Sequence, residues 1–209
     1  MLTIKDKHII TDIETNGLLG TVTKFWCAWI YDSASQEYKG YKDLDEYIDA
    51  LNVYGTSGYN LVFHNGIKYD VPCLKRLSGK DFVFDPRDCV IDTLVYARLV
   101  WSNIKDLDMG LIRSGRLPKE LFGSHSLKAY GYRMRELKGT YGETEEAWDS
   151  FSEEMYKYNH QDVVVTKMLF DKLMGKGYPW GAVQLEHEIA WVIAKQERNG
   201  FVFDKDKAV

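Results

Sequence analysis

Long apolar runs are absent from this 209-residue chain. A membrane-spanning helix needs about 20 consecutive apolar residues, whereas the densest apolar stretch, Phe25 to Tyr31, has only the length of a strand. The first residues, MLTIKDKHII, contain neither the apolar core nor the small-residue cleavage site of a signal peptide. We therefore expect a cytoplasmic protein without a membrane span.

Clusters of thiol and imidazole groups are also absent. The three cysteines, Cys27, Cys73 and Cys89, form no CxxC pair and lie among apolar neighbours, which is typical of reduced cysteines in or near a core. Zinc and iron sites in proteins are usually built from Cys and His. Any metal site in this chain is therefore expected to use oxygen ligands.

A general excess of positive charge is missing as well, because the formal net charge is −4. One segment differs: from Arg113 to Lys138 there are seven Lys or Arg against two Glu, interleaved with Phe122, Tyr130 and Tyr132. Basic residues that alternate with aromatics suit single-stranded nucleic acid, through phosphate pairing and base stacking. A solvated helical face with inward aromatics explains the same pattern.

The apolar pattern predicts strands first and then alternating strands and helices. Strands are expected around residues 12 and 14 and over 24–31, 37–41 and 59–64, with a short one before Asp92. Such an order favours an α/β sheet of mixed direction, an antiparallel meander plus parallel strands, flanked by helices. The helices are expected over 43–51, from about Pro72 to Leu77, after Asp92, and over 124–137, 151–173 and 183–198.

The first strand and turn, HIITDIETNGL, hold two carboxylates in an apolar setting. Because side chains alternate along a strand, Asp12 and Glu14 share one face and Ile13 lies on the other. Adjacent buried carboxylates repel, and a divalent cation would remove that conflict. Acid pairs of this spacing are common, however, and others in the chain, such as Asp43 and Asp45, are expected to be solvated surface.

Two later motifs offer partners for this pair. In FHNGIKYD a strand ends, Asn65-Gly66 turns the chain, and Asp70 lies at or just before a helix N-terminus, where it could simply cap the helix. In YNHQD the spacing of four places Tyr158 and Asp162 on one face of a helix. The three motifs are informative as a set because of the order in which they occur along the chain.

In that order, DIET, NGIKYD and YNHQD resemble the three exonuclease motifs of the DEDD superfamily of 3′–5′ exonucleases, in the version with tyrosine in the third motif. Longer stretches, among them VFHNGIKYDVP and FGSHSLKAYGYRM, resemble the proofreading domain of family A replicative DNA polymerases of short-tailed bacteriophages. The resemblance covers about residues 9–173. It implies a ribonuclease H-like fold and cleavage of single-stranded or frayed DNA from the 3′ end.

The resemblance also implies a role for each motif residue. Two ions, Mg²⁺ or Mn²⁺, would be held by Asp12, Glu14, Asp70 and Asp162. Asp12 would bridge both ions, Glu14 and Asp162 would complete the ion site that activates water, and Asp70 would hold the second ion largely through water. The hydroxyl of Tyr158 would orient the attacking water.

Substrate contacts are expected beside the first two motifs. The turn that directly follows the metal-binding strand is expected to line the 3′-terminal nucleotide, because it lies next to the acids of that strand. Phe63 could wedge against the terminal base or pack in the core, and Lys68 could meet phosphate or only solvent. The full set of expected substrate-binding residues is Asn16, Gly17, Leu18, Phe63, Asn65 and Lys68.

Two segments are expected along the chain. Residues 1–174 would form the exonuclease domain. Residues 175–209 would form a linker and helix that resemble the start of a polymerase domain and are too short to synthesise DNA.

The expected partners are primer-terminus DNA and a polymerase, either in cis or as a separate chain, in the cytoplasm of an infected bacterium. An exoribonuclease and a noncatalytic DNA- or polymerase-docking module are the alternatives.

Overall fold

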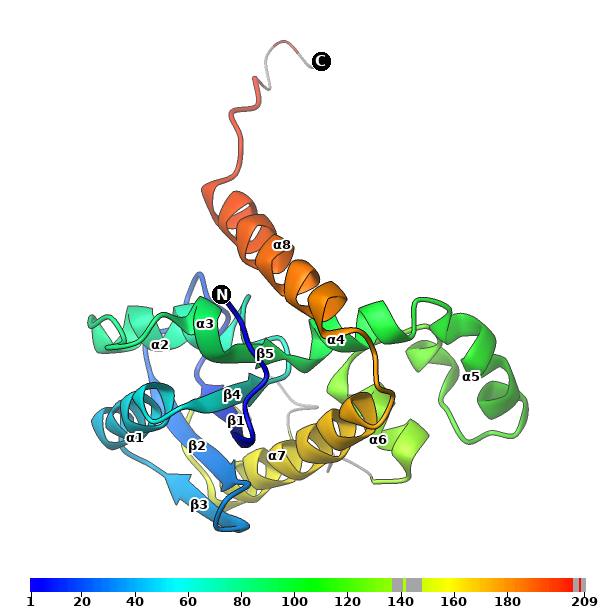
Figure 1. Ribbon diagram of the computed structural model, residues 1–209, viewed down its shortest axis with the longest axis horizontal. Coiled ribbons are helices and arrows are strands. Elements are labelled where there is room, and N and C mark those ends of the chain that lie inside the picture. Colours follow the sequence, from blue (N-terminus) through cyan, green and yellow to red (C-terminus); the bar gives the residue numbers. More distant parts are fainter. Residues whose placement is uncertain (137–140, 142–147, 205–206, 208–209) are drawn as a thin grey trace.

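A five-stranded mixed sheet forms the centre of the molecule in the computed structural model, which describes residues 1–136, 141, 148–204 and 207 (Figure 1). The strand order is β3-β2-β1-β4-β5. β1 pairs with β2, and β2 with β3, in antiparallel fashion, whereas the β1–β4 and β4–β5 pairs are parallel. The predicted mixed sheet is therefore confirmed. The strands are β1 Lys7–Thr15, β2 Phe25–Asp32, β3 Glu37–Tyr41, β4 Tyr59–Phe63 and β5 Val90–Asp92.

Each of the six predicted helices is present, but several ends differ. α3, α5 and η1 were not predicted, α1 continues to Thr56 beyond the predicted end at Leu51, and α8 begins three residues earlier than the pattern indicated. α6 begins only at Leu127, because the Ser126 side chain accepts the Ala129 N–H and caps the helix there. The predicted end of that helix, Leu137, lies outside the described residues, as does Lys138. The helices are α1 Leu44–Thr56, α2 Asp70–Ser78, α3 Pro86–Cys89, α4 Thr93–Val100, α5 Ile104–Arg113, the 3₁₀ helix η1 Lys119–Leu121, α6 Leu127–Met134, α7 Glu153–Met174 and α8 Trp180–Asn199.

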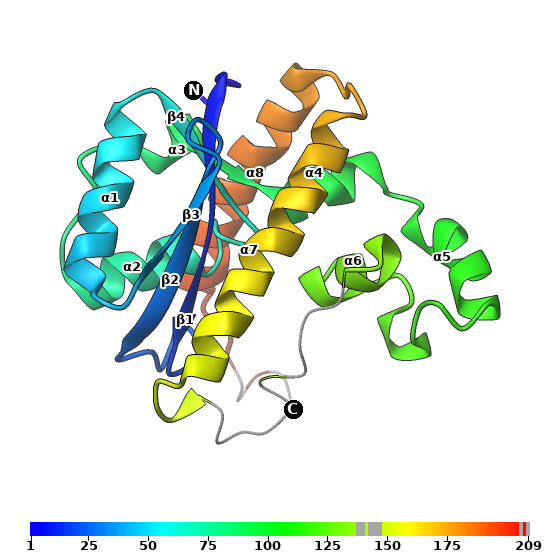
Figure 2. The same cartoon turned by 90° about the horizontal axis from the view of Figure 1, so that it is seen from below.

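Helices cover both faces of the sheet, α1 and α2 on one side and α7 on the other (Figure 2). Alternation along β1 decides which residues meet which helices. Ile9 and Ile13 pack in the larger cluster with residues of α1 and α2, whereas Ile10 packs with Val163 and Phe170 of α7. Asp12 and Glu14 have the parity of Ile10, so they lie on the face that α7 covers.

The carboxyl ends of the three parallel strands β1, β4 and β5 lie side by side at one end of the sheet. The last parallel β1–β4 pair is Ile10 with Val62, so Asp12 and Glu14 extend past it. β4 ends at Phe63 and leads through a turn into α2, whose first residue is Asp70. β5 ends at Asp92. In open α/β sheets ligands bind at the carboxyl ends of the strands, because loops rather than paired backbone face the solvent there.

The last helix, α8, packs on the same body rather than standing apart. Its residues Val183, His187 and Ala194 are buried, and Ala194 belongs to the larger core cluster. The domain boundary at residue 174 stays a prediction. In the part of the chain that the structure describes, no helix is long and apolar enough to cross a membrane.

Leu169 of α7 tests how much the α7 packing contributes to stability. Its side chain is fully buried with Tyr96, Leu127 and Val165, so Leu169→Ala should lower the free energy of unfolding by about 2–5 kcal/mol. Leu185→Ala on α8 is the matched control, because that leucine is 56% exposed and should change stability by less than about 0.5 kcal/mol. Urea denaturation measures both; equal effects would contradict this account of the core.

Candidate active site

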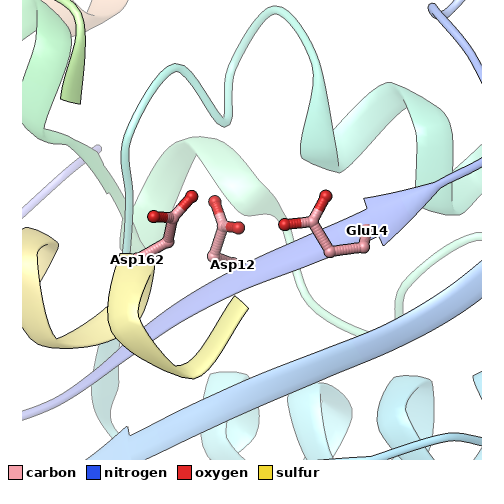
Figure 3. Close-up of side chains that lie close together, drawn as sticks. All are labelled: Asp12, Glu14 and Asp162. Carbon is pink, nitrogen blue, oxygen red and sulfur yellow. The ribbon is translucent and has the colours of Figure 1, made fainter. Parts of the chain in front are cut away.

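Three carboxylates converge at the carboxyl end of the parallel strands. Asp12 and Glu14 of β1 and Asp162 of α7 each offer one oxygen, and these oxygens lie within 4.8 Å of one another. Their carboxylates point to the same side, toward the segment that leads into α2 (Figure 3). Glu14 and Asp162 are buried and Asp12 is half-buried. Three hard oxygen donors this close together fit a divalent cation, which would offset their mutual repulsion.

Asn159 supports the cluster from the same helix. It lies three residues before Asp162, one turn away on the same face of α7, and its Nδ2 donates a hydrogen bond of 2.8 Å to Asp12 Oδ2. Asn159 is fully buried, and its Oδ1 accepts no hydrogen bond from the described residues. The amide therefore fixes the orientation of the Asp12 carboxylate and links the strand to the helix.

The register between α7 and β1 is set through β2. Trp29 pairs directly with Asp12 across the β1–β2 ladder, and its indole Nε1 donates to the Tyr156 carbonyl oxygen at 3.0 Å. The centroid of its ring also lies 4.7 Å from the ring centroids of both Tyr156 and His160. Because α7 is held at Tyr156, two residues before the third motif, Asp162 lies beside Asp12. His160 therefore packs against the sheet, with its ring near those of Trp29 and Tyr38.

Asp70 occupies a different position from the three clustered acids. It is the first residue of α2, as predicted, but its side chain is only 3% exposed and it is not among the three clustered carboxylates. Burial raises the pKa of Asp70 to about 8, and the nearby charge of Asp92 adds to this, while hydrogen bonds from its own N–H and that of Ile13 oppose it. A cation beside Asp70 would favour its ionised form.

Asp92 caps helix α4. Its Oδ1 accepts the N–H of Leu94 at the start of α4 and the N–H of Asn65, both at 2.9 Å. Its Oδ2 accepts the N–H of Ile67 at 3.1 Å. One buried carboxylate thus satisfies three backbone donors and joins the end of β5 to the turn that leads to Asp70.

A cavity of about 630 Å³ opens beside Asp12 and Asp162. Among the described residues, the exposed Arg98 of α4 forms no ion pair, so its guanidinium is available to an anion in this cavity. The volume is in the range of ligand-binding sites. The polar residues of its wall are Asp12, His64, Asn65, Arg98, Ser124, His125, Ser126 and Asp162.

A buried ion pair supports the loop from Gly123 to Ser126, which lines this cavity. Arg133 donates from Nε and Nη2 to Asp108 at 2.9 and 2.8 Å, and Nη2 also donates to the Ser124 carbonyl oxygen at 2.7 Å. Asp108 accepts the Gly123 N–H at 2.9 Å. His125 lines the cavity, and its Nδ1 lies 2.7 Å from Tyr130 Oη.

A second cavity, of about 750 Å³, lies on the Glu14 side of the acidic cluster. The predicted turn, Asn16, Gly17 and Leu18, lines it, and the Leu18 side chain is 77% exposed. Trp148 lies on its wall. The Tyr69 hydroxyl, 2.6 Å from Thr15 Oγ1, donates to the Gly17 carbonyl oxygen at 2.7 Å and fixes the turn. The third-motif residue Tyr158 lies near this wall, with its ring 6.3 Å from that of Trp148.

Two predicted substrate contacts are corrected by the structure. Phe63 is 1% exposed and packs in the larger core cluster, so the prediction that it meets the terminal base is wrong. Lys68 does not line either cavity: its Nζ forms an ion pair of 2.7 Å with Glu197 of α8. A lysine near the motif suggested a phosphate contact, but no feature of the sequence indicates that α8 passes beside it.

Several residues of the site were missed. Asn159 could have been found, because it lies within YNHQD at helical spacing from Asp162. Arg98 and Trp148 carried no sequence signal, since each reaches the site through a helix or loop far from the motifs along the chain.

Comparison with protein families matches residues 9–174 to the RNase H superfamily. The chain therefore belongs to the RNase H superfamily. A solved structure described as the apo form of the nuclease shares the fold with a TM-score of 0.61 at 17% identity, over 96% of this chain and 91% of that one. The predicted ribonuclease H-like fold is confirmed.

The relatives among curated proteins are DNA polymerases of bacteriophages. The chain is 47% identical to the DNA-directed DNA polymerase of Escherichia phage T7 and 46% identical to that of Enterobacteria phage T3, in each case over 94% of this chain. The predicted resemblance to phage polymerases is thus confirmed. The chain spans 33% of the length of each of these relatives.

Asn159→Leu tests the support of Asp12. Leucine has a similar volume and removes a buried amide oxygen that lacks a partner among the described residues, so the free energy of unfolding should change by less than about 1 kcal/mol. Losing the donor to Asp12 should weaken Mn²⁺ binding about tenfold. Calorimetric titration with Mn²⁺ measures this; unchanged affinity would mean that Asn159 only fills space.

Proposed function

We propose that this chain is a metal-dependent 3′–5′ exonuclease that removes nucleotides from single-stranded or frayed DNA. The observation that carries the proposal is the convergence of Asp12, Glu14 and Asp162 within 4.8 Å, between two cavities. Membership of the RNase H superfamily and the similarity to phage DNA polymerases support it.

The proposed cofactors are two ions of Mg²⁺ or Mn²⁺. The three clustered carboxylates would hold one ion, with Asp12 shared by the second and Asp70 reaching that second ion largely through water. The ions would supply positive charge for the attacking and leaving oxygens of phosphodiester hydrolysis. The oxygen-only donor set fits these hard cations better than zinc or copper.

The reaction proposed is hydrolysis of the last phosphodiester bond. A water oxygen bonds to phosphorus, the bond from phosphorus to the 3′ oxygen of the penultimate nucleotide breaks, and that oxygen takes a proton. The products are a nucleoside 5′-monophosphate and a strand shortened by one, with a free 3′-hydroxyl. Tyr158, one turn before Asp162 on α7, would orient the water through its hydroxyl.

The two cavities suggest where the strand lies. The cavity beside Glu14 would take the terminal nucleotide, with Leu18 and Trp148 contacting its base. The cavity beside Asp162 would take the phosphate on the other side of the scissile bond, with Arg98 as its cation and Asn65 and Ser124 as hydrogen-bonding groups.

The biological role proposed is proofreading for a phage replicative polymerase in the cytoplasm of the infected host. Residues 1–174 would supply the nuclease and 175–209 the link to a polymerase domain. The phage DNA polymerases that this chain resembles support the proposal, because each is about three times as long as the matched region.

Asp162→Ala is the decisive variant. Outer-shell groups alone are worth 10–100-fold at metal sites, so loss of a direct carboxylate should slow cleavage by more than about 100-fold. The assay is a denaturing-gel time course on 5′-labelled single-stranded DNA and a matched RNA, with and without Mg²⁺ or Mn²⁺. Asp171→Ala, an exposed aspartate on the same helix, is the matched control and should cleave like the parent.

Each outcome of that assay has a distinct meaning. A metal-dependent ladder that shortens from the 3′ end of DNA, and is lost in Asp162→Ala only, supports the proposal. Preferential shortening of the RNA would replace it with an exoribonuclease. Intact DNA in every lane, with DNA still retained in a binding assay, would instead make the chain a docking module.

Arg98→Ala tests the path of the strand. Removing this cation from the cavity should raise KM for single-stranded DNA about tenfold and leave kcat nearly unchanged, because a phosphate contact of this kind positions the strand. Arg87→Ala is the matched control, since Arg87 is exposed on α3 and lines neither cavity. Steady-state kinetics at two salt concentrations measures both; equal KM values would remove Arg98 from the proposed path.

A further inference from the structure

We infer that His187, on helix α8, is a positioning residue for the turn His64–Tyr69, which carries Asn65 and leads to Asp70. α8 lies beyond residues 9–174, the part matched to the RNase H superfamily. The turn's catalytic importance rests on the proposed function; its dependence on His187 rests on the contacts described below.

His187 makes two hydrogen bonds in a buried setting, with 1% of its surface exposed. Its Nδ1 lies 2.7 Å from the Val183 carbonyl oxygen, which can only accept, so Nδ1 carries the proton. Its Nε2 is therefore the acceptor for the Asp92 backbone N–H, at 2.8 Å. The imidazole is neutral in this arrangement, and burial lowers its pKa in agreement with that state.

The bond from Asp92 to His187 matters because β5 is short and lies at the edge of the sheet. It has three residues, Val90–Asp92, and among the described residues it pairs only with β4. His187 supplies from α8 an acceptor for the last residue of this edge strand. The backbone at Asp92 is thus held from both sides, by β4 and by α8.

The position of the Asp92 backbone determines where its carboxylate points, and that carboxylate holds the turn. It accepts the N–H groups of Asn65 and Ile67, at 2.9 and 3.1 Å. Asn65 lines the cavity beside Asp162 and has a positive φ of 70°, a conformation that needs support from its surroundings. A continuous series of hydrogen bonds therefore runs from α8 through Asp92 to the cavity wall.

α8 reaches the same turn at a second point, through the exposed ion pair of Glu197 with Lys68. Surface pairs of this kind contribute little by themselves, so the buried bond of His187 carries the positioning. The helix that resembles the beginning of a polymerase domain is, by these contacts, part of the support of the nuclease site.

The test compares His187→Leu, His187→Gln and Val183→Ala. Leucine fills the space without an acceptor, whereas the side-chain oxygen of glutamine can accept the Asp92 N–H near the position of Nε2. Val183→Ala weakens the packing of the same helix without touching Asp92. Amide hydrogen exchange over residues 64–70, measured on the metal-free protein, is the first readout, and kcat and KM on single-stranded DNA are the second.

His187→Leu should speed exchange of the Asn65 and Ile67 amides about tenfold and lower kcat about tenfold with little change in KM, as expected for a group that acts through a ligand's support. His187→Gln should restore most of both, and Val183→Ala should change neither. Unchanged exchange in His187→Leu, or equal acceleration in Val183→Ala, would overturn the inference.

The exchange experiment needs no catalysis, so it separates two failures. If the parent cleaves no DNA, the proposed function fails, while the exchange rates still decide whether His187 holds the turn. If the parent cleaves DNA and His187→Leu keeps its kcat, the positioning role fails and the proposed function stands.

Discussion

The repulsion among Asp12, Glu14 and Asp162 is the interaction on which the rest of the site depends. Three carboxylates within 4.8 Å, two of them buried, oppose folding unless something compensates their charge. The fold tolerates them because it places them at the end of the parallel strands, where a cation can enter from two adjacent cavities. Under the proposed function, the same placement would bring a phosphodiester in those cavities next to the ions.

The surrounding structure serves to hold acids that would otherwise move apart. Trp29 connects α7 to the sheet: it pairs with Asp12 in the β ladder and donates a hydrogen bond to the helix two residues before the third motif. Asn159 then bonds directly to Asp12. On the other side, the buried Asp92 gathers three backbone N–H groups and fixes the turn before Asp70. The bonds to Asp12 and Asp92 replace carboxylate–water contacts with fixed hydrogen bonds.

Much of the fold was predictable because the apolar periods are clear. Short apolar stretches bounded by turn residues predicted the strands, and a period of three to four predicted α7 in spite of its Val163-Val164-Val165 run. The predicted start of α6 is three residues early because the Ser126 side chain caps the helix at Leu127, and the short helices α3, α5 and η1 were not predicted. Phe63 was misplaced because a strand end beside a motif can face either the core or the substrate, and one residue of register decides which.

The sequence by itself determined the residue types and their order: three acidic motifs, the strand that carries Asp12 and Glu14, and the helix that carries Asp162. These are local properties, written in spacing and alternation. Only the tertiary structure decided that Asn159 orients Asp12, that Arg98 and Trp148 line the cavities, that Lys68 pairs with α8, and that His187 reaches Asp92. Such contacts join residues up to 147 positions apart, and spacing along a chain contains no information about which distant side chains packing will bring together.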